Sequence, residues 1–451
     1  MNPPSKGVKP PVSPRTLWCA FAAALTLRLF FLFGFHIYTI QPWTNHFNFG
    51  WEMGRIARSL VTGYGYSSPF GGHTGPSAWT APLYPLFIAA VFKLFGIYSQ
   101  TSALVLMLSN VLFDALAVFP LWCIAQRCFG LRLARASVWM WAVCPFTFQY
   151  IPRIWVSALA MLLFTVIFAL TLRMRGIGEA PQPLSATATP RRWLLLGLIW
   201  GVLALGMASF LLFLPLSLLW LLLPAWQEPG RPQLRRMALR AAGTFAIVVA
   251  CMTPWMIRNA IAFHQFIPMR TDFGLELAIG NGPGAQGLPL VYDHPSVNPV
   301  QFRLYRHLGE VKYCRERGAL AKSLIRENPA HYAADTLRRI DFYWFGVPPP
   351  SNPNPLVQFL PTGVFAFFGM CGLLGLALAL HNRIPAAPLI AFAFLLLPFL
   401  YYFVFVEDRF RYSLDPLLYC LTLYLWMSAE ESNRVRWLTP GWWRQRFSRH
   451  P

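Results

Sequence analysis

One acidic side chain lies in a polar stretch that joins two apolar segments. Glu52 is the single acid between residues 45 and 85, where two arginines, two histidines and many aromatic residues also lie. The spacing predicts a short helix over 51–60, in which Trp51, Ile56 and Leu60 share one face and Glu52 turns elsewhere. A carboxylate in this place could accept a proton from an attacking hydroxyl group. The alternative is an amphipathic helix that only rests on the membrane.

Cations that could accompany this carboxylate lie near the ends of later apolar segments. Arginine binds phosphate through two parallel hydrogen bonds and stays charged when partly buried, so an acid beside several arginines suits an anionic lipid headgroup. The candidates for binding a donor phosphate are Arg153, Arg258, Arg409 and Arg411. The candidates for the rest of a substrate pocket are His46, Asn48, Arg55, Tyr84, Asn259 and Glu407.

These arginines also have ordinary structural explanations. Arginine and lysine at the ends of membrane helices often only extend toward the interface. The acids and arginines of 407–411 could pair with each other. The sequence leaves both alternatives open for each of these side chains.

The composition indicates the scaffold that must position these residues. Hydrophobic residues make up 56% of the 451 residues and charged residues only 12%, which is about half the charged fraction of a soluble protein. Apolar runs long enough to cross a bilayer recur along the whole chain. The expected fold class is therefore an all-α polytopic membrane protein.

The arrangement of positive charge explains the formal net charge of +21. Twenty of the 38 lysines and arginines fall in six short segments between or beyond apolar spans, and only four acids share those segments or their edges. Such asymmetry is typical of cytoplasmic loops under the positive-inside rule. It argues against a nucleic-acid partner and places both termini in the cytoplasm.

The order of apolar and polar segments predicts about ten crossings and five parts. These parts are a cytoplasmic tail over 1–16, an N-terminal membrane module over 17–262, a mainly helical extracytoplasmic domain over 263–355, C-terminal membrane helices over 356–428 and a basic cytoplasmic tail over 429–451. The outer domain holds ten basic and eight acidic residues. The first span is expected to be a retained signal anchor rather than a cleaved peptide.

The first module contains an outer loop over 40–80, expected to be catalytic, and a short apolar segment over 82–96. If 82–96 crossed the bilayer, the next span would deliver Arg127, Arg132 and Arg135 to the outside. A full crossing also needs about 20 apolar residues, and Lys93 interrupts this segment early. We therefore expect an interfacial or re-entrant helix over 82–96.

Two charged residues in the middle of apolar spans suggest another possible function. Arg28 is costly in hydrocarbon, so it is expected to face the protein interior or a wet cavity, either as a structural partner or as part of a site. Asp114 could belong to the proton relay of a transporter, or it could be a single buried polar residue bonded to a neighbouring helix. Nucleotide-binding loops, zinc-protease motifs and metal-spaced Cys/His sets are absent from the sequence. The need for a divalent metal stays open.

Four stretches resemble a known family in their order and spacing. They are IARSLVTGYGYSSPF with the following Pro-Leu-Tyr-Pro helix, QRCFGLRLARA (126–136), PWMIRNAIAFHQFIPMRTDFGLELAIGN (254–281) and RFRYSLDPLL (409–418). Together they resemble the GT-C membrane glycosyltransferases, which include bacterial aminoarabinose transferases of lipid A and protein O-mannosyltransferases. The resemblance covers most of the membrane part. It implies a polyprenyl-phosphate sugar donor, an inverting transfer on the outer side and an acid of the first loop as general base.

The first loop departs from the family pattern at one position. Many members have that acid eight residues before the alanine matching Ala57, and here that position holds Phe49. Glu52 follows three residues later, nearly one helical turn, so its side chain could face the same way. Glu52 is therefore the expected base.

The expected function is an inverting GT-C-type glycosyltransferase of a bacterial inner membrane, acting on an envelope lipid, glycan or protein. A transporter or flippase of lipid-linked sugars, which would use Arg28 and Asp114, stays open as an alternative. So does a non-catalytic assembly protein of the envelope. The sequence does not indicate the sugar, the acceptor or the oligomeric state.

Overall fold

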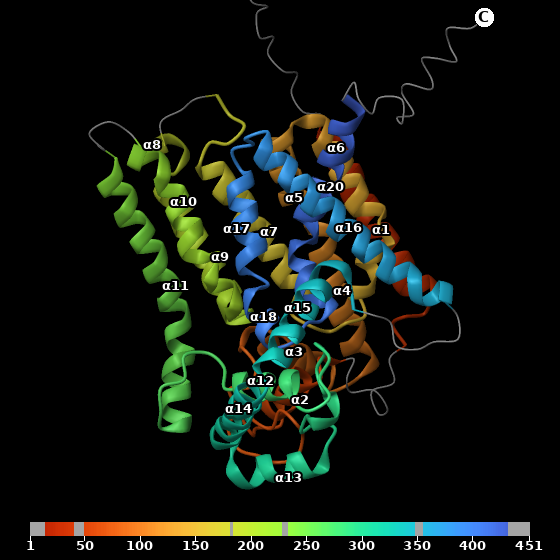
Figure 1. Ribbon diagram of the computed structural model, residues 1–451, viewed down its shortest axis with the longest axis vertical. Coiled ribbons are helices and arrows are strands. Elements are labelled where there is room, and N and C mark those ends of the chain that lie inside the picture. Colours follow the sequence, from red (N-terminus) through yellow and green to blue (C-terminus); the bar gives the residue numbers. More distant parts are fainter. Residues whose placement is uncertain (1–13, 40–48, 181–183, 228–232, 348–354, 432–451) are drawn as a thin grey trace, which may run out of the picture.

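The chain forms a tall helical bundle with a cluster of shorter helices at one end (Figure 1). The computed structural model describes residues 14–39, 49–180, 184–227, 233–347 and 355–431. Within these ranges the β pairing consists of one isolated antiparallel bridge between Ser67 and Pro76. The all-α membrane fold expected from the sequence is confirmed.

The N-terminal half of the chain builds most of the bundle. Its helices, in chain order, are α1 (Pro14–Gly34), α2 (Glu52–Val61), α3 (Leu83–Phe95), α4 (Gln100–Leu116), α5 (Val118–Phe129), α6 (Leu131–Val143), η2 (Pro145–Tyr150), α7 (Ser157–Met174), α8 (Leu184–Thr187), α9 (Pro190–Gly206), η3 (Ala208–Leu212), α10 (Leu214–Gln227) and α11 (Leu234–Phe263). At about 45 Å, α11 is longer than the hydrocarbon core is thick. It extends along the side of the bundle to the level of α12 (Figure 1).

The C-terminal half supplies the cluster of shorter helices and then returns to the bundle. Its helices are α12 (Phe273–Asn281), η4 (Val291–Asp293), α13 (Pro299–Leu308), α14 (Glu310–Glu327), α15 (Pro329–Phe345), α16 (Pro355–His381), α17 (Ala387–Leu396), α18 (Phe399–Phe403), α19 (Asp408–Arg411), η5 (Tyr412–Leu414) and α20 (Asp415–Glu431). In Figure 1, α2, α3 and α12–α14 lie together at the end opposite α8.

Six helical segments among the described residues are long and apolar enough to cross a membrane. They are Arg15–Gly34, Gln100–Phe129, Ser157–Met174, Ala208–Gln227, Leu234–Phe263 and Pro361–His381. Other apolar helices, such as α6, α9 and α20, have 13 to 17 residues. The count of ten crossings therefore stays a prediction. The 13 residues of α3 span about 20 Å, which favours the expected interfacial helix.

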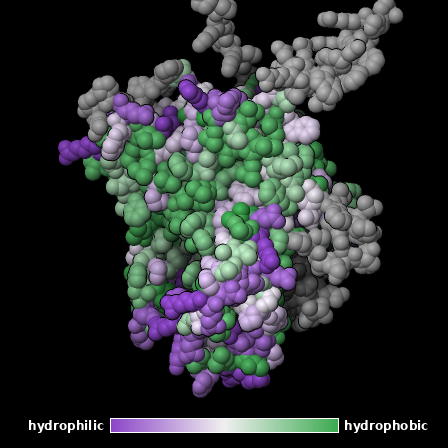
Figure 2. Space-filling model, viewed as in Figure 1, coloured by the Kyte–Doolittle hydropathy of each residue, from purple (hydrophilic) through white to green (hydrophobic). Residues whose placement is uncertain are grey.

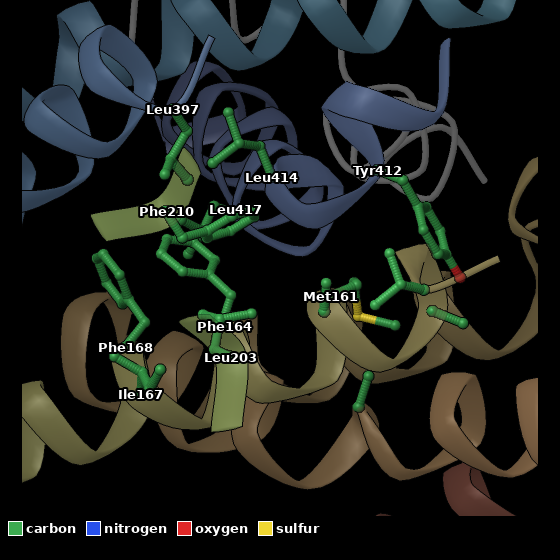
Figure 3. Packing of buried hydrophobic residues seen from close by; sticks show 14 of the residues in the cluster. Met161, Phe164, Ile167, Phe168, Leu203, Phe210, Leu397, Tyr412, Leu414 and Leu417 are labelled. Atoms are coloured by element: carbon green, nitrogen blue, oxygen red, sulfur yellow. The ribbon is translucent and has the colours of Figure 1, made fainter. Parts of the chain in front are cut away.

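Apolar side chains fill the centre of the bundle. In Figure 3, Phe164 and Phe168 of α7 point toward Phe210 of η3 and Leu397, which follows α17. The rings of Phe164 and Phe210 meet edge to face, with centroids 5.4 Å apart. Apolar residues also cover much of the outer surface between two polar ends (Figure 2). An apolar surface over an apolar core is what a lipid-facing bundle requires.

A buried ion pair joins the first span to the rest of the bundle. Arg28 Nε lies 2.5 Å from Asp114 Oδ2, and the two side chains are 0% and 2% exposed. The remaining guanidinium hydrogens bond the carbonyl oxygens of Ala24, Trp141 and Ala142 and the hydroxyl of Thr147. Tyr412 donates to Asp114 Oδ1 at 2.8 Å. These partners account for the expected interior placement of both charges and give the pair a structural role.

The cluster of shorter helices has its own apolar core. Phe70 and Trp79, from the loop after α2, pack with Leu275 of α12 and with Tyr305 and Tyr313 of α13 and α14. Glu310, which is 4% exposed, accepts hydrogen bonds from the Ala78 amide at 2.6 Å and the Tyr305 hydroxyl at 2.8 Å. The first outer loop is therefore anchored to α12–α14.

The packing of α12 against α14 gives a first testable expectation. A Cβ on Gly274 would overlap the carbonyl oxygen of Cys314, which is backbone and cannot rotate away. We expect Gly274→Ala to lower the free energy of unfolding by about 1–3 kcal/mol, as overpacked cores do. Gly243→Ala on α11 is the matched control, because a Cβ there meets no atom within 4 Å. Thermal unfolding of both variants in detergent measures the difference, and equal midpoints would contradict the close packing of α12 on α14.

Candidate active site

The backbone before α2 determines where Glu52 lies. Gly50 and Trp51 have φ of 74° and 45°, so the chain turns sharply before the helix begins. The helix was expected over 51–60 and is observed from Glu52 to Val61. Its buried residues include Ile56 and Ala57, and α2 packs along α3. Glu52 therefore occupies the first turn of a short, fixed helix.

The aromatic residue at the family's acid position belongs to the core. Phe49 is fully buried, and its ring lies 5.8 Å from that of Phe92 and 5.3 Å from that of Tyr98. These contacts fix Phe49 between α2 and the region around α3. Glu52 is 8% exposed and is the acid that α2 contributes to this end of the molecule.

Titratable groups from three other segments act on Glu52: His294, Arg270 and Arg409. His294 directly follows η4, and its Nε2 lies 3.4 Å from Glu52 Oε1. Burial raises the pKa of Glu52, and the guanidinium groups of Arg55, Arg409 and Arg270 act in the opposite direction. Burial thus makes the carboxylate a better proton acceptor, and the nearby cations keep its ionised form stable. Both properties suit a general base.

More carboxyl groups lie around this centre. Burial raises the pKa of Asp272, and burial together with the Asp272 carboxylate raises the pKa of Glu276 well above its usual range. Glu52 adds to both shifts, and Glu407 adds to that of Glu276. Asp272 and Glu276 lie four residues apart at the start of α12, on one helical face. The segment before α12 and the 407–411 segment thus face Glu52 together.

Arg409 is the predicted phosphate ligand that the structure brings to Glu52. Its Nε lies 2.9 Å from Glu407 Oε2, and its guanidinium carbon lies 4.0 Å from the centre of the Trp155 ring. Its side chain is 16% exposed and that of Glu407 is 34% exposed. Burial raises the pKa of Glu407, and Arg409 acts against this shift. The pairing of acids with arginines in 407–411, which the sequence left open, is therefore present.

Arg153 lies in the same region and is paired with an acid. Its Nη1 donates to both oxygens of Asp408, at 2.9 and 3.0 Å. Its guanidinium also lies over the Tyr150 ring at 5.4 Å. The Arg153 side chain keeps 40% of its surface exposed. Arg153 thus borders the cluster and holds the 407–411 segment against η2.

Arg258 makes structural contacts with the first outer loop. It donates to the carbonyl oxygens of Ser77 at 2.6 Å and Tyr66 at 2.7 Å, and it lies over the Tyr66 and Trp255 rings. Its neighbour Asn259 is fully buried and donates to the Ile267 carbonyl. Both residues, expected in the site, connect α11 to adjoining loops, and their roles in substrate binding stay predictions.

The guanidinium group of Arg411 is likewise bonded to other groups of the protein. It lies 3.1 Å from Asp415 Oδ1 and donates to the carbonyl oxygens of Trp344 and Phe365 at 2.8 Å each. With 2% of its surface exposed, it joins α15, α16 and α20. Phosphate binding by Arg411 stays a prediction.

The remaining predicted pocket residues divide into three groups. Arg55 is close to Glu52 and donates to Ser296 Oγ at 2.9 Å. Tyr84 is 1% exposed in the core, with its hydroxyl 3.5 Å from Asn110 Oδ1. His46 and Asn48 lie outside the described residues.

Sequence reasoning missed Arg270, Asp272, Glu276 and His294. The signal that could have found the two acids is their four-residue spacing in MRTDFGLEL, which places them on one face of a helix. Arg270 donates to the Trp79 carbonyl at 3.0 Å and pairs with Asp272. In the part of the chain that the structure describes, no three His, Cys, Asp or Glu side chains form a group that could hold a metal ion.

Comparisons with known proteins identify the fold. No protein-family model matches the sequence, and no curated protein matches it. The archaeal oligosaccharyltransferase AglB from Archaeoglobus fulgidus, in complex with an inhibitory peptide and a dolichol-phosphate, aligns with a TM-score of 0.54 and 13% identity, covering 92% of this chain and 50% of AglB. The apo form of the Archaeoglobus fulgidus oligosaccharyltransferase aligns with a TM-score of 0.52 and 15% identity, covering 92% of this chain and 50% of that protein. ArnT from Cupriavidus metallidurans, bound to undecaprenyl phosphate, aligns with a TM-score of 0.36 and 14% identity, covering 84% of this chain and 73% of ArnT.

The likeness to AglB confirms the expected GT-C fold. This chain spans about half the length of AglB.

Proposed function

We propose that this protein is an inverting membrane glycosyltransferase that takes a sugar from a polyprenyl-phosphate donor. The acceptor hydroxyl oxygen attacks the anomeric carbon, the bond from that carbon to the phosphate oxygen breaks, and Glu52 takes the hydroxyl proton. The phosphate leaves with the bonding electrons. The proposal is carried by one observation: a GT-C fold in which Glu52 is buried and the positive charge of Arg409, from a distant part of the chain, acts on its carboxylate.

The developing charge on the phosphate requires cations whose side chains remain partly accessible. Arg409 and Arg270 are paired with Glu407 and Asp272, but their side chains stay 16% and 42% exposed, and the positive charge of each lowers the Glu52 pKa. Arg258 and Arg411 have their guanidinium hydrogens bonded to backbone carbonyls. We therefore assign the leaving phosphate to Arg409 and Arg270. Stabilising such charge is commonly a large term in catalysis.

The proposed orientation follows from the two ends of the bundle. The basic segments around the α5–α6 turn and α8 lie at the end opposite α2 and α12–α14 (Figure 1). By the positive-inside rule, the basic end faces the cytoplasm. The Glu52 cluster then faces the outer side of a bacterial inner membrane, where a lipid-linked sugar can be presented to an envelope acceptor. In AglB and ArnT the lipid carriers seen are dolichol-phosphate and undecaprenyl phosphate.

A test of this function uses labelled donors rather than a known acceptor. Undecaprenyl-phosphate-linked hexoses, pentoses and amino sugars, each labelled in the sugar, are incubated with envelope membranes that contain the protein. The proposal expects at least one donor to lose its sugar to another molecule with inversion at the anomeric carbon. Donor movement across proteoliposomes without bond cleavage would instead support the transport alternative. If no donor showed either sugar transfer or movement across the bilayer, the proposal would be contradicted.

Arg409 gives a second expectation in the same assay. Arg409→Ala is expected to lower the rate of sugar transfer on the order of 10²–10³-fold, since one donor group to developing charge is lost. Arg409→Lys should recover part of this loss, because charge is kept but the fork geometry is not. Arg303→Ala, at an exposed position of α13, is the matched control and should transfer at the normal rate. A normal rate for Arg409→Ala would remove Arg409 from the mechanism.

A further inference from the structure

The two ring nitrogens of His294 have different partners. The Ser296 amide donates to His294 Nδ1 at 3.2 Å, so Nδ1 carries a lone pair. In the neutral ring the proton therefore lies on Nε2. Nε2 faces Glu52 Oε1 at 3.4 Å. A small closing movement makes this a hydrogen bond, and such contacts commonly tighten when substrate binds.

Aromatic rings hold the imidazole in this orientation. The ring centroid of His294 lies 5.3 Å from that of Trp51, 5.2 Å from that of Phe70 and 5.9 Å from that of Trp79. The His294 side chain is 9% exposed. Turning the Nδ1 edge of the imidazole toward Glu52 would break the bond from the Ser296 amide. It would also disturb the packing of the three rings from the first outer loop. Nε2–H is thus the group presented to the carboxylate.

We propose that His294 is a positioning residue that fixes the Glu52 carboxylate and favours its ionised form by donating from Nε2. This inference rests on the proposed function, because it concerns the base of that reaction. A hydrogen bond donated to a carboxylate stabilises the charged form over the neutral acid. The donor therefore lowers the Glu52 pKa, against the upward effect of burial.

The groups around the pair agree with a neutral imidazole. Burial, together with the positive charge of Arg55, lowers the pKa of His294 to about 4, so the ring is uncharged at neutral pH. The other charged groups facing Glu52 are Arg55 on its own helix, Arg270, Asp272 and Glu276 at the start of α12, and Glu407 and Arg409 before α20. His294 adds a neutral donor to this charged set.

The sign of the expected pH effect follows directly. A general base acts when ionised, so activity falls as pH drops through the Glu52 pKa. Loss of the Nε2 donor raises that pKa and moves the acidic limb of the kcat/KM profile to higher pH. For His294→Phe we expect a displacement of about one pH unit, as for loss of one hydrogen bond to a charged group.

Conservative variants separate this role from simple packing. His294→Gln places an amide N–H near the position of Nε2 and should keep the limb close to its normal pH. His294→Asn places its amide near Nδ1, too short to reach Glu52, and should behave like His294→Phe. If His294→Phe does not fold, the Gln and Asn variants carry the comparison alone.

A second measurement needs no turnover. The infrared C=O stretch of protonated Glu52, identified by its absence in Glu52→Gln, is titrated in purified protein. We expect the midpoint to rise in His294→Phe and to return toward normal in His294→Gln. Equal midpoints in all variants would overturn the positioning role while leaving Glu52 as base. Normal sugar transfer by Glu52→Gln would remove Glu52 as the base, and with it the role of His294. Absence of sugar transfer by the unaltered protein with every donor would instead overturn the proposed function.

Discussion

Glu52→Gln is expected to abolish sugar transfer while the protein still folds and inserts. The amide has nearly the same shape as the carboxylate but cannot accept the acceptor's proton. Loss of a general base lowers rates on the order of 10²–10⁴-fold. Because Glu52 is 8% exposed and its burial raises its pKa, the neutral amide should not destabilise the fold. Release of labelled sugar from undecaprenyl-phosphate donors measures the loss.

The matched control is an acid on the same side of the molecule without a place in the cluster. Glu316 on α14 has a side chain that is 50% exposed, and its ion-pair partner is Lys312 at 4.0 Å. Glu316→Gln should transfer sugar at the normal rate. If Glu52→Gln also retained near-normal transfer, Glu52 would not be the base, and the acids of α12 would become the next candidates.

The second large effect concerns the buried pair that joins α1 to α4. Asp114→Leu leaves the Arg28 charge without its carboxylate in a fully buried position. We expect a loss of about 3–5 kcal/mol in the free energy of unfolding, as for other uncompensated buried charges. Arg28→Met should cost a similar amount. The double variant should cost less than the sum of the two, because both charges are removed together.

Thermal unfolding in detergent micelles measures these differences. The control is Lys312→Ala, since exposed ion pairs contribute about 0–1 kcal/mol. Midpoints for the single variants equal to that of the wild type would contradict a structural role for the pair. A folded Asp114→Leu protein that loses only donor movement across the bilayer would support the transport alternative instead.

Much of the architecture follows from the sequence, because lipid imposes strong rules. Long apolar spans, basic loops and the short helix that carries Glu52 are local patterns, and each is present in the structure. The resemblance added the order of these elements, and the AglB fold agrees with it. Length alone does not give the number of crossings, because helices such as α6 and α17 have only 13 and 10 residues, fewer than a bilayer-spanning helix needs.

The composition of the site could be predicted only in part. Arg258 and Arg411 were candidates because arginine binds phosphate, yet both are bonded to backbone carbonyl oxygens. Every residue type carries such carbonyls, so the sequence cannot show which arginines they occupy. His294 and Arg270 were missed because their closeness to Glu52 depends on how the segment after α11 folds back over the first outer loop.

A structure of the protein with undecaprenyl phosphate bound would show directly where the donor phosphate lies. We expect the phosphate between Arg409 and Arg270, with the Glu52 carboxylate facing the side from which an acceptor hydroxyl would attack. Phosphate bound elsewhere, with Glu52 remote from it, would show that these residues do not form the active site.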